Sequence, residues 1–93
     1  MAKVKLNLLN IFHLRINKRT LEYDGNTVGN IISQFLKDYR EKLDDELLDK
    51  KKQKLNTHIL ILLNGRNIKY LKNYKTRLKD GDELYFSYPL SGG

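Results

Sequence analysis

One amphipathic segment in the first half of the chain restricts the possible folds most. Thr27 is a favoured helix N-cap residue, and the apolar residues that follow it recur at spacings of three and four. These residues are Val28, Ile31, Ile32, Phe35, Leu36, Tyr39 and Leu43. The pattern predicts a helix over residues 27–40 with one buried face. Because the other apolar segments are short and strand-like, the helix is expected to bury this face against a sheet.

The N-terminal part of the chain predicts two strands joined as a hairpin. Apolar residues alternate with polar ones from Val4 to Leu8, and the pattern continues less regularly through Ile11. A second strand is expected from Arg19 to Tyr23, where the Asp24-Gly25 turn signal ends it. The short polar sequence INK between the two strands favours a hairpin.

The C-terminal half predicts two further strands and two tight turns. The apolar sequence HILILLNG is typical of a central strand, and its Asn64-Gly65 ending is a strong hairpin-turn signal. Asp80-Gly81 is a second turn signal, and a last strand follows from Glu83 to Tyr88. The intervening segment 44–58 either extends the helix or forms a second short one. This order predicts a single α+β domain over 1–93, a roll with a mixed sheet of four to five strands and one main helix across it.

The residue types argue against an enzyme and against a metal site. The chain has no cysteine, which excludes disulfides and thiolate chemistry. His13 and His58 stand alone in expected strands, with no carboxylate at metal-ligand spacing. No apolar run approaches the ~18 residues that a bilayer span needs, and the charged N-terminus is unlike a signal peptide. We therefore expect a cytoplasmic protein with no catalytic residue, no bound metal and no membrane contact.

The net charge of +7 is unevenly distributed along the chain. Lysines gather in residues 50–54, and the stretch from Arg66 to Lys79 is basic, with no acidic residue. The first interpretation of these clusters is a solvated, lysine-rich surface. A second is a surface that docks on an acidic protein. Nucleic-acid binding is the weakest of the three, because the pattern matches no known reader module.

The C-terminus is the one segment with a chemical use that needs no side-chain catalyst. Pro89 cannot continue the hydrogen-bonded ladder of the last strand, and the residues beyond it can reach about 13–14 Å. Gly92 and Gly93 have no Cβ, so they can pass through a narrow channel towards reacting groups. The Gly93 carboxylate is then an unhindered nucleophile that a partner enzyme could join to ATP as an acyl-adenylate. The alternative is an ordinary frayed end.

Several motifs together resemble the MoaD/ThiS family of ubiquitin-like sulfur carriers. That family shows an apolar strand into Asn-Gly, then Leu-x-Asp-Gly-Asp-Glu, a hydrophobic strand and a Pro-x-x-Gly-Gly ending. The matching residues here are Asn64, Gly65, Leu78, Asp80, Gly81, Asp82, Glu83, Pro89, Gly92 and Gly93. IFHLR at 11–15 is similar to the ending of the family's first strand, and TVGNIISQFLKDY is similar to its helix opening.

The resemblance implies a β-grasp fold and a carrier acted on by partner enzymes. An adenylating enzyme of the MoeB, ThiF or ubiquitin-activating type would use ATP and magnesium to activate Gly93, with no cofactor bound stably by the chain itself. A sulfurtransferase would then convert Gly93 to a thiocarboxylate. The long connector after the helix resembles the molybdopterin-synthase small subunit, which implies its large subunit as a partner and molybdenum-cofactor biosynthesis as the pathway. Archaeal relatives are also conjugated to target lysines, so a protein modifier is the alternative.

The same resemblance suggests how the tail and a docking surface are arranged. Pro89, Leu90 and Ser91 would orient the tail, with Gly92 giving clearance at Gly93. Many molybdopterin-type members carry Pro-Pro before the last four residues and a hydrophobic residue before it, whereas this chain has Ser87, Tyr88 and Pro89. The expected docking residues are Tyr85, Tyr88, Leu60, Leu62 and Arg66. The alternative for the apolar face of the 60–63 region is burial beneath segment 44–58.

Overall fold

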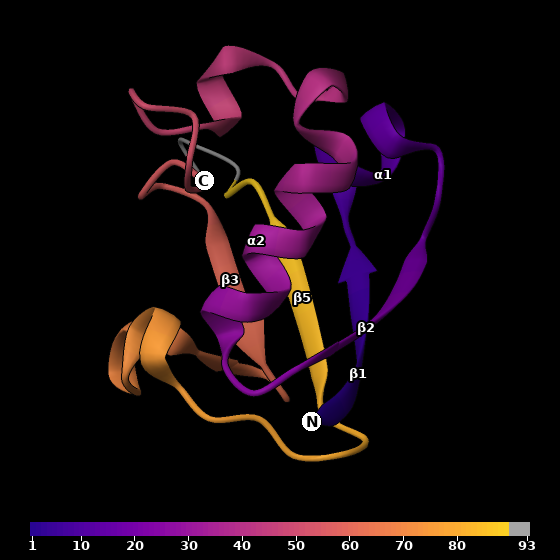
Figure 1. Cartoon of the computed structure of the whole chain (residues 1–93). Coiled ribbons are helices and arrows are strands. Elements are labelled where there is room, and N and C mark those ends of the chain that lie inside the picture. Colours follow the sequence, from indigo (N-terminus) through magenta and orange to yellow (C-terminus); the bar gives the residue numbers. More distant parts are fainter. Residues whose placement is uncertain (90–93) are drawn as a thin grey trace.

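A computed structural model describes residues 1–89 of the 93-residue chain. A five-stranded mixed sheet forms one layer, in the order β2-β1-β5-β3-β4, and helix α2 crosses one of its faces (Figure 1). The strands are β1 (Ala2–Leu8), β2 (Thr20–Gly25), β3 (Leu60–Leu63), β4 (Arg66–Asn67) and β5 (Glu83–Ser87). The helices are α1 (Asn10–Ile16) and α2 (Val28–Tyr39), with short 3-10 helices η1 (Arg40–Lys42), η2 (Asp45–Leu47), η3 (Ile68–Tyr70) and η4 (Asn73–Lys75). The predicted α+β class and β-grasp arrangement are confirmed.

Helix α2 begins and ends close to its predicted limits. The Thr27 Oγ1 accepts a hydrogen bond from the Asn30 N–H at 3.2 Å, and Asn30 Oδ1 accepts one from the Thr27 N–H at 3.1 Å. This reciprocal pair is a capping box that satisfies two N–H groups at the start of the helix. The buried residues of α2 belong to the predicted apolar stripe: Val28, Ile31, Ile32, Phe35 and Leu36.

The predicted hairpin between the first two strands is wrong in its connection. The first strand ends at Leu8, and α1 occupies the residues expected to continue it, so His13 lies on a helix. Phe12 and Ile16 are spaced four apart and are both buried, whereas Leu14 is 70% exposed. In a strand these three side chains would share one face. The helix therefore allows the chain to bury Phe12 and Ile16 without Leu14, while β1 and β2 still pair antiparallel.

The two turns predicted in the C-terminal half are confirmed, whereas the predicted end of the second strand at Asp24-Gly25 is wrong, because both residues pair with β1 within β2. Asn64 and Gly65 have φ angles of 51° and 89°, and they form a two-residue loop between the paired residues Leu63 and Arg66. Positive φ at both positions is the type I′ geometry that the Asn-Gly pair favours. At the second turn Gly81 has a φ of 87°, and its N–H donates to the Lys3 carbonyl at 3.0 Å. His58, also expected in a strand, lies in the turn before β3.

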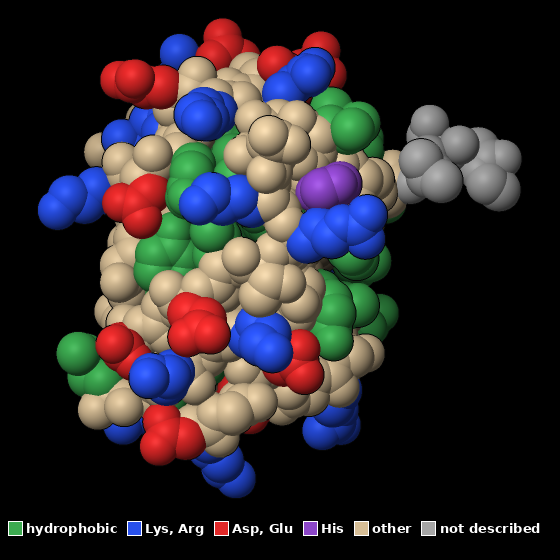
Figure 2. All heavy atoms as spheres, turned by 90° about the vertical axis from the view of Figure 1, so that its right-hand side faces the viewer, with side chains coloured by type: hydrophobic (Ala, Val, Ile, Leu, Met, Phe, Trp, Pro, Cys, Tyr) green, Lys and Arg blue, Asp and Glu red, His purple; other side chains and the backbone are tan. Residues whose placement is uncertain are grey.

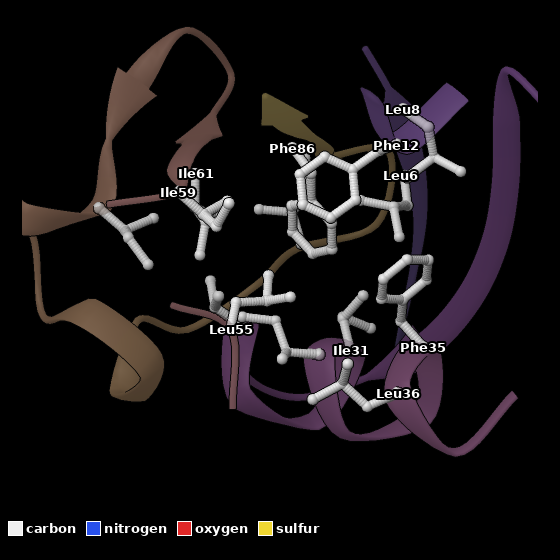
Figure 3. Packing of buried hydrophobic residues seen from close by; sticks show 14 of the residues in the cluster. Leu6, Leu8, Phe12, Ile31, Phe35, Leu36, Leu55, Ile59, Ile61 and Phe86 are labelled. Atoms are coloured by element: carbon white, nitrogen blue, oxygen red, sulfur yellow. The ribbon is translucent and has the colours of Figure 1, made fainter. Parts of the chain in front are cut away.

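Three aromatic rings form the centre of the core. The Phe12 ring centroid lies 6.3 Å from that of Phe35 and 5.8 Å from that of Phe86, and the Phe35 and Phe86 centroids are 5.3 Å apart. Figure 3 shows the rings of Phe12 and Phe86 next to each other, with Phe35 reaching towards them from α2. The core thus joins α1, α2 and β5.

In residues 1–89, no helix has the length and apolar character to cross a membrane.

Segment 44–58 is neither an extension of α2 nor a regular second helix. After α2 the chain continues through η1 and η2 and then an irregular stretch. Its apolar residues Leu47, Leu48 and Leu55 are buried in the same core, and Leu48 and Leu55 form an isolated β-bridge. The segment therefore closes one end of the core.

Candidate functional site

The strand that leads to the C-terminal tail lies at the centre of the sheet. β5 pairs with β1 in parallel and with β3 antiparallel, so Phe86 stands opposite Leu8 on one side and Ile61 on the other. Leu84 and Phe86 have no exposed surface. A strand paired on both edges and buried on one face gives the tail a rigid base.

The side chain of Asn10 holds the end of β5 and the residue after it. The Tyr88 N–H donates to Asn10 Oδ1 at 3.0 Å, and Asn10 Nδ2 donates to the Tyr88 carbonyl at 3.0 Å and to Ser87 Oγ at 3.0 Å. Just before it, the Leu9 N–H donates to the Phe86 carbonyl at 3.0 Å. The amide of Asn10 therefore continues the support of β5 after the strand itself has ended at Ser87.

Asn10 was not among the predicted site residues. Its φ of 39° places it in the left-handed region, which asparagine tolerates better than most residues with a side chain. The sequence signal was the single polar residue within LLNIF, which interrupts the strand pattern. That signal marks a change of backbone direction, but it does not identify Ser87 and Tyr88 as partners.

The structure places only part of the predicted tail. Leu90, Ser91, Gly92 and Gly93 lie outside the described residues, so their predicted roles stay predictions. Pro89 is exposed and directly follows Tyr88, whose N–H is bonded to a side chain rather than to a neighbouring strand. The ladder therefore stops before the proline.

Three of the five predicted docking residues lie together. Leu62 pairs with Tyr85, and Leu60 pairs with Ser87 one step along the same face. Paired residues point to the same side of a sheet, and the residues between them, Ile61 and Phe86, point to the core. Leu60, Leu62 and Tyr85 are half-buried on the face opposite α2, and we call these three residues the outer-face patch.

Arg66 and Tyr88 do not join the outer-face patch. Arg66 pairs with Leu63, whose side chain is buried, so the register assigns it to the other side of the sheet. Tyr88 packs against the core and lines a small cavity of about 240 Å³ together with Asp44, Glu46 and Leu47. Any docking role of these two residues would involve a different surface.

The described residues hold no cluster of candidate metal ligands, and their two histidines stand apart. In residues 1–89, no three His, Asp or Glu side chains lie close enough together to hold a metal ion. His13 Nδ1 lies 3.2 Å from the Lys18 carbonyl oxygen, and His58 is exposed in its turn. Figure 2 shows positive and negative side chains interspersed over the face that carries α1 and β2. What the described residues supply at this end of the sheet is a supported strand β5, which leads to the C-terminal tail.

The Asn10 hydrogen bonds predict a measurable change at Tyr88. Asn10→Gly keeps the left-handed backbone accessible but removes the side chain, so the Tyr88 amide should exchange with solvent roughly fivefold faster, corresponding to loss of about 1 kcal/mol of hydrogen bonding. Hydrogen exchange followed by NMR measures this rate. The matched control is Asn17→Gly at the other end of α1, where φ is also positive at 62° and the N–H donates to the His13 carbonyl. Equal acceleration in both variants would contradict the role of the Asn10 side chain.

A family model, a sequence relative and two solved structures resemble this chain. The model of the ThiS family matches residues 13–93. A "putative sulfur carrier protein" of Archaeoglobus fulgidus is 34% identical over 80 residues, which are 84% of this chain and 89% of that protein. The solution structure of small archaeal modifier protein 1 from Methanosarcina acetivorans is 31% identical, has a TM-score of 0.86 and covers 100% of this chain and 98% of that one. A chain in the structure of the Amycolatopsis orientalis BexX/CysO complex shares the fold, at 22% identity and a TM-score of 0.74, over 97% of this chain and 99% of that one.

Proposed function

Because the chain belongs to the ThiS family of ubiquitin-like sulfur carriers, we propose that it carries sulfur as a thiocarboxylate on Gly93. Proteins of this family are carriers that other enzymes act on, and they are not enzymes themselves. The observation that supports the proposal most is the way β5 is held: it is paired on both edges, its support is extended by Asn10 to Tyr88, and Pro89 follows. A rigid strand directly before a short glycine-ended arm delivers that arm to a partner at a fixed position.

The proposed chemistry takes place in partner proteins. An oxygen of the Gly93 carboxylate attacks the α-phosphorus of ATP in an adenylating enzyme of the MoeB or ThiF type, and pyrophosphate leaves. The terminal sulfur of a sulfurtransferase persulfide then attacks the acyl carbon, and AMP leaves. A second thiol of the partner cleaves the resulting acyl disulfide, so that an enzyme disulfide forms and the thiocarboxylate is released. ATP and magnesium belong to the partner in this scheme.

The residues of this chain contribute position and access. Gly92 and Gly93 lack the Cβ atoms that would narrow their passage to the partner's active site. Pro89, Leu90 and Ser91 connect them to β5, and we assign these three residues to orientation of the tail. The outer-face patch supplies half-buried apolar surface beside β5, and we assign it to docking of the adenylating enzyme.

For the sulfur acceptor, we propose the precursor bound by a molybdopterin-synthase large subunit. This choice rests on the length of the chain between α2 and β3, which resembles the molybdopterin-synthase small subunit. Ser87 stands where many such subunits have a hydrophobic residue, and its hydroxyl accepts a hydrogen bond from Asn10. The contact with a large subunit would therefore use other residues, for which Tyr85 on the outer face is our candidate.

A second candidate function is conjugation of Gly93 to lysines of target proteins. The observation that favours it is the 31% identity to small archaeal modifier protein 1 over 100% of this chain. The adenylate is a common intermediate: a lysine amine attacking its acyl carbon gives an isopeptide bond, whereas a persulfide gives the thiocarboxylate. The two functions differ only in the second nucleophile.

Intact-mass spectrometry separates these outcomes. Incubation with a MoeB-type enzyme, ATP and magnesium should give a species heavier by one AMP moiety, held by the enzyme. Adding a persulfide-loaded sulfurtransferase should give a mass increase equal to the exchange of one oxygen for one sulfur. In cells, tagged protein that forms a ladder of larger species on immunoblots indicates conjugation. If competent partners produce neither the sulfur exchange nor the ladder, both proposals fail.

A further inference from the structure

A second surface, separate from the tail and from the outer-face patch, has the features of a binding pocket. It lies between residues 54–57, β3 and the loop 67–75, and encloses about 530 Å³, within the range of roughly 300–1,000 Å³ usual for ligand pockets. In Figure 1 these two loops lie on the same side of the molecule, at the edge formed by β3 and β4. The sheet order places this edge at the end opposite β2.

The floor of the pocket is aliphatic and its rim is positively charged. The floor consists of the buried residues Leu55, Ile59, Ile61 and Ile68. The rim carries four exposed lysines: Lys54, Lys69, Lys72 and Lys75. An apolar floor under like charges favours a ligand that has an apolar group between acidic ones.

The walls of the pocket are fixed by hydrogen bonds. The Leu55 N–H donates to the Tyr74 hydroxyl at 3.3 Å, which joins the two loops. The Lys72 N–H donates to Thr76 Oγ1 at 3.0 Å, and the Lys69 N–H donates to Asn67 Oδ1 at 2.9 Å. Burial raises the pKa of the Tyr74 phenol, so its hydroxyl stays neutral near pH 7 and adds no negative charge to the rim. A pocket built in this way does not have to order itself when a ligand binds.

The rim lysines have no acidic partner within residues 1–89. The ion pairs there join Arg15 to Asp44 and Lys52 to Asp45, and neither involves a rim residue. The sequence between Asn64 and Lys79 contains no acidic residue at all. The positive potential around the pocket is therefore not compensated by its own loop.

We propose that this pocket binds an acidic segment of a partner protein, with one aliphatic side chain of the segment against the apolar floor. A nucleic acid would need exposed rings on which its bases could stack. Tyr74, the one aromatic residue in the pocket, is half-buried, its hydroxyl bonds Leu55 and the Lys54 Nζ lies 5.6 Å from its ring centroid. The exposed ring of Tyr70 is outside the pocket lining. The floor therefore suits a leucine-like side chain better than a base.

The position of the pocket would give a partner protein a second contact point besides the tail. Ile59, at the floor, directly precedes Leu60, which pairs with Ser87 at the tail end of β5. A partner segment in the pocket would lie beside the same end of the sheet. This proposal does not depend on sulfur transfer, because it concerns binding by residues outside the tail.

The test uses NMR titration of the full-length protein with synthetic ten-residue peptides of aspartate and glutamate around one central leucine. We expect saturable shifts of the backbone amides of residues 54–57 and 67–75, weakened by added salt. Replacing the central leucine by serine should raise the Kd roughly tenfold, because the apolar contact is lost. The double variant Lys69→Glu, Lys72→Glu should also raise the Kd about tenfold or more.

The matched control changes the same charge at the opposite edge of the sheet. Lys18→Glu with Arg19→Glu alters two exposed residues in the connection between α1 and β2 and should leave the Kd within about twofold. Equal weakening by both double variants would overturn the proposal, since it would show only a net-charge effect. Equal affinity of the leucine and serine peptides would overturn it as well. So would a single-stranded oligonucleotide that shifts the pocket amides when the leucine peptide does not. The assay contains no ATP and no activating enzyme, so its result is independent of the sulfur-carrier test.

Discussion

Deletion of Gly93 is expected to reduce adenylation by the partner enzyme below detection. The deletion leaves a carboxylate on Gly92, but it moves the nucleophile back along the arm by about 3.3–3.6 Å. Because a displacement of ~1 Å can already cost a factor of roughly 10², the shortened arm should not reach the α-phosphorus of ATP in an attack geometry. ATP–pyrophosphate exchange measures the loss directly, and the sulfur-exchange product should disappear with it.

Two further variants distinguish the effect of a shorter arm from a general loss of folding. Lys18→Ala changes an exposed residue in the α1–β2 connection and should retain full exchange. Gly93→Ala keeps the length of the arm but adds a Cβ beside the reacting carboxylate, so exchange should fall without being abolished. If the Gly93 deletion exchanged pyrophosphate as fast as the intact chain, the terminal glycine would not be the activated group.

In the proposed chemistry the chain positions the tail, and its core supports the strand β5 that leads to it. The core covers one face of the strand through Leu84 and Phe86, and the pairing with β1 and β3 fixes its direction. Asn10 carries this order past the end of the strand to Tyr88. The order that the structure describes therefore reaches the residue directly before Pro89.

The parts of the fold that could be predicted from the sequence are those determined by neighbouring residues. Helix α2 depends on the Thr27–Asn30 capping box and on an apolar stripe within one segment. The Asn64-Gly65 turn depends on two adjacent residues that both accept positive φ. In each case the interacting groups lie a few positions apart, so the pattern was visible in the sequence.

The parts that could not be predicted depend on contacts between distant residues. Seven residues of α1 are too few for their periodicity to distinguish helix from strand. The helix is favoured by the contacts of Phe12, whose ring packs against those of Phe35 and Phe86 (Figure 3). Likewise Asn10 meets its partners Ser87 and Tyr88 across 77 and 78 positions of sequence, a separation at which one sequence carries no pairing signal.

The importance of Phe12 leads to the largest expected change in stability. Phe12 is fully buried, so Phe12→Ala leaves a cavity and should lower the free energy of unfolding by about 3–5 kcal/mol. Domains of this size have only about 5–15 kcal/mol in total, and each kcal/mol corresponds to a change of about 4–8 °C in Tm. We therefore expect the Tm to fall by at least about 12 °C, as measured by circular dichroism or calorimetry.

Leu14→Ala is the matched control on the same helix. Leu14 is 70% exposed, so its truncation removes little buried surface and should change stability by no more than about 0.5 kcal/mol. The two variants together test the helix itself, because a strand over these residues would bury Phe12 and Leu14 on one face. Similar losses for both variants would favour the strand, whereas a large loss for Phe12→Ala alone supports the helix. Helix α1 also begins at Asn10, whose side chain bonds Ser87 and Tyr88, so the helix connects the core to the end of β5.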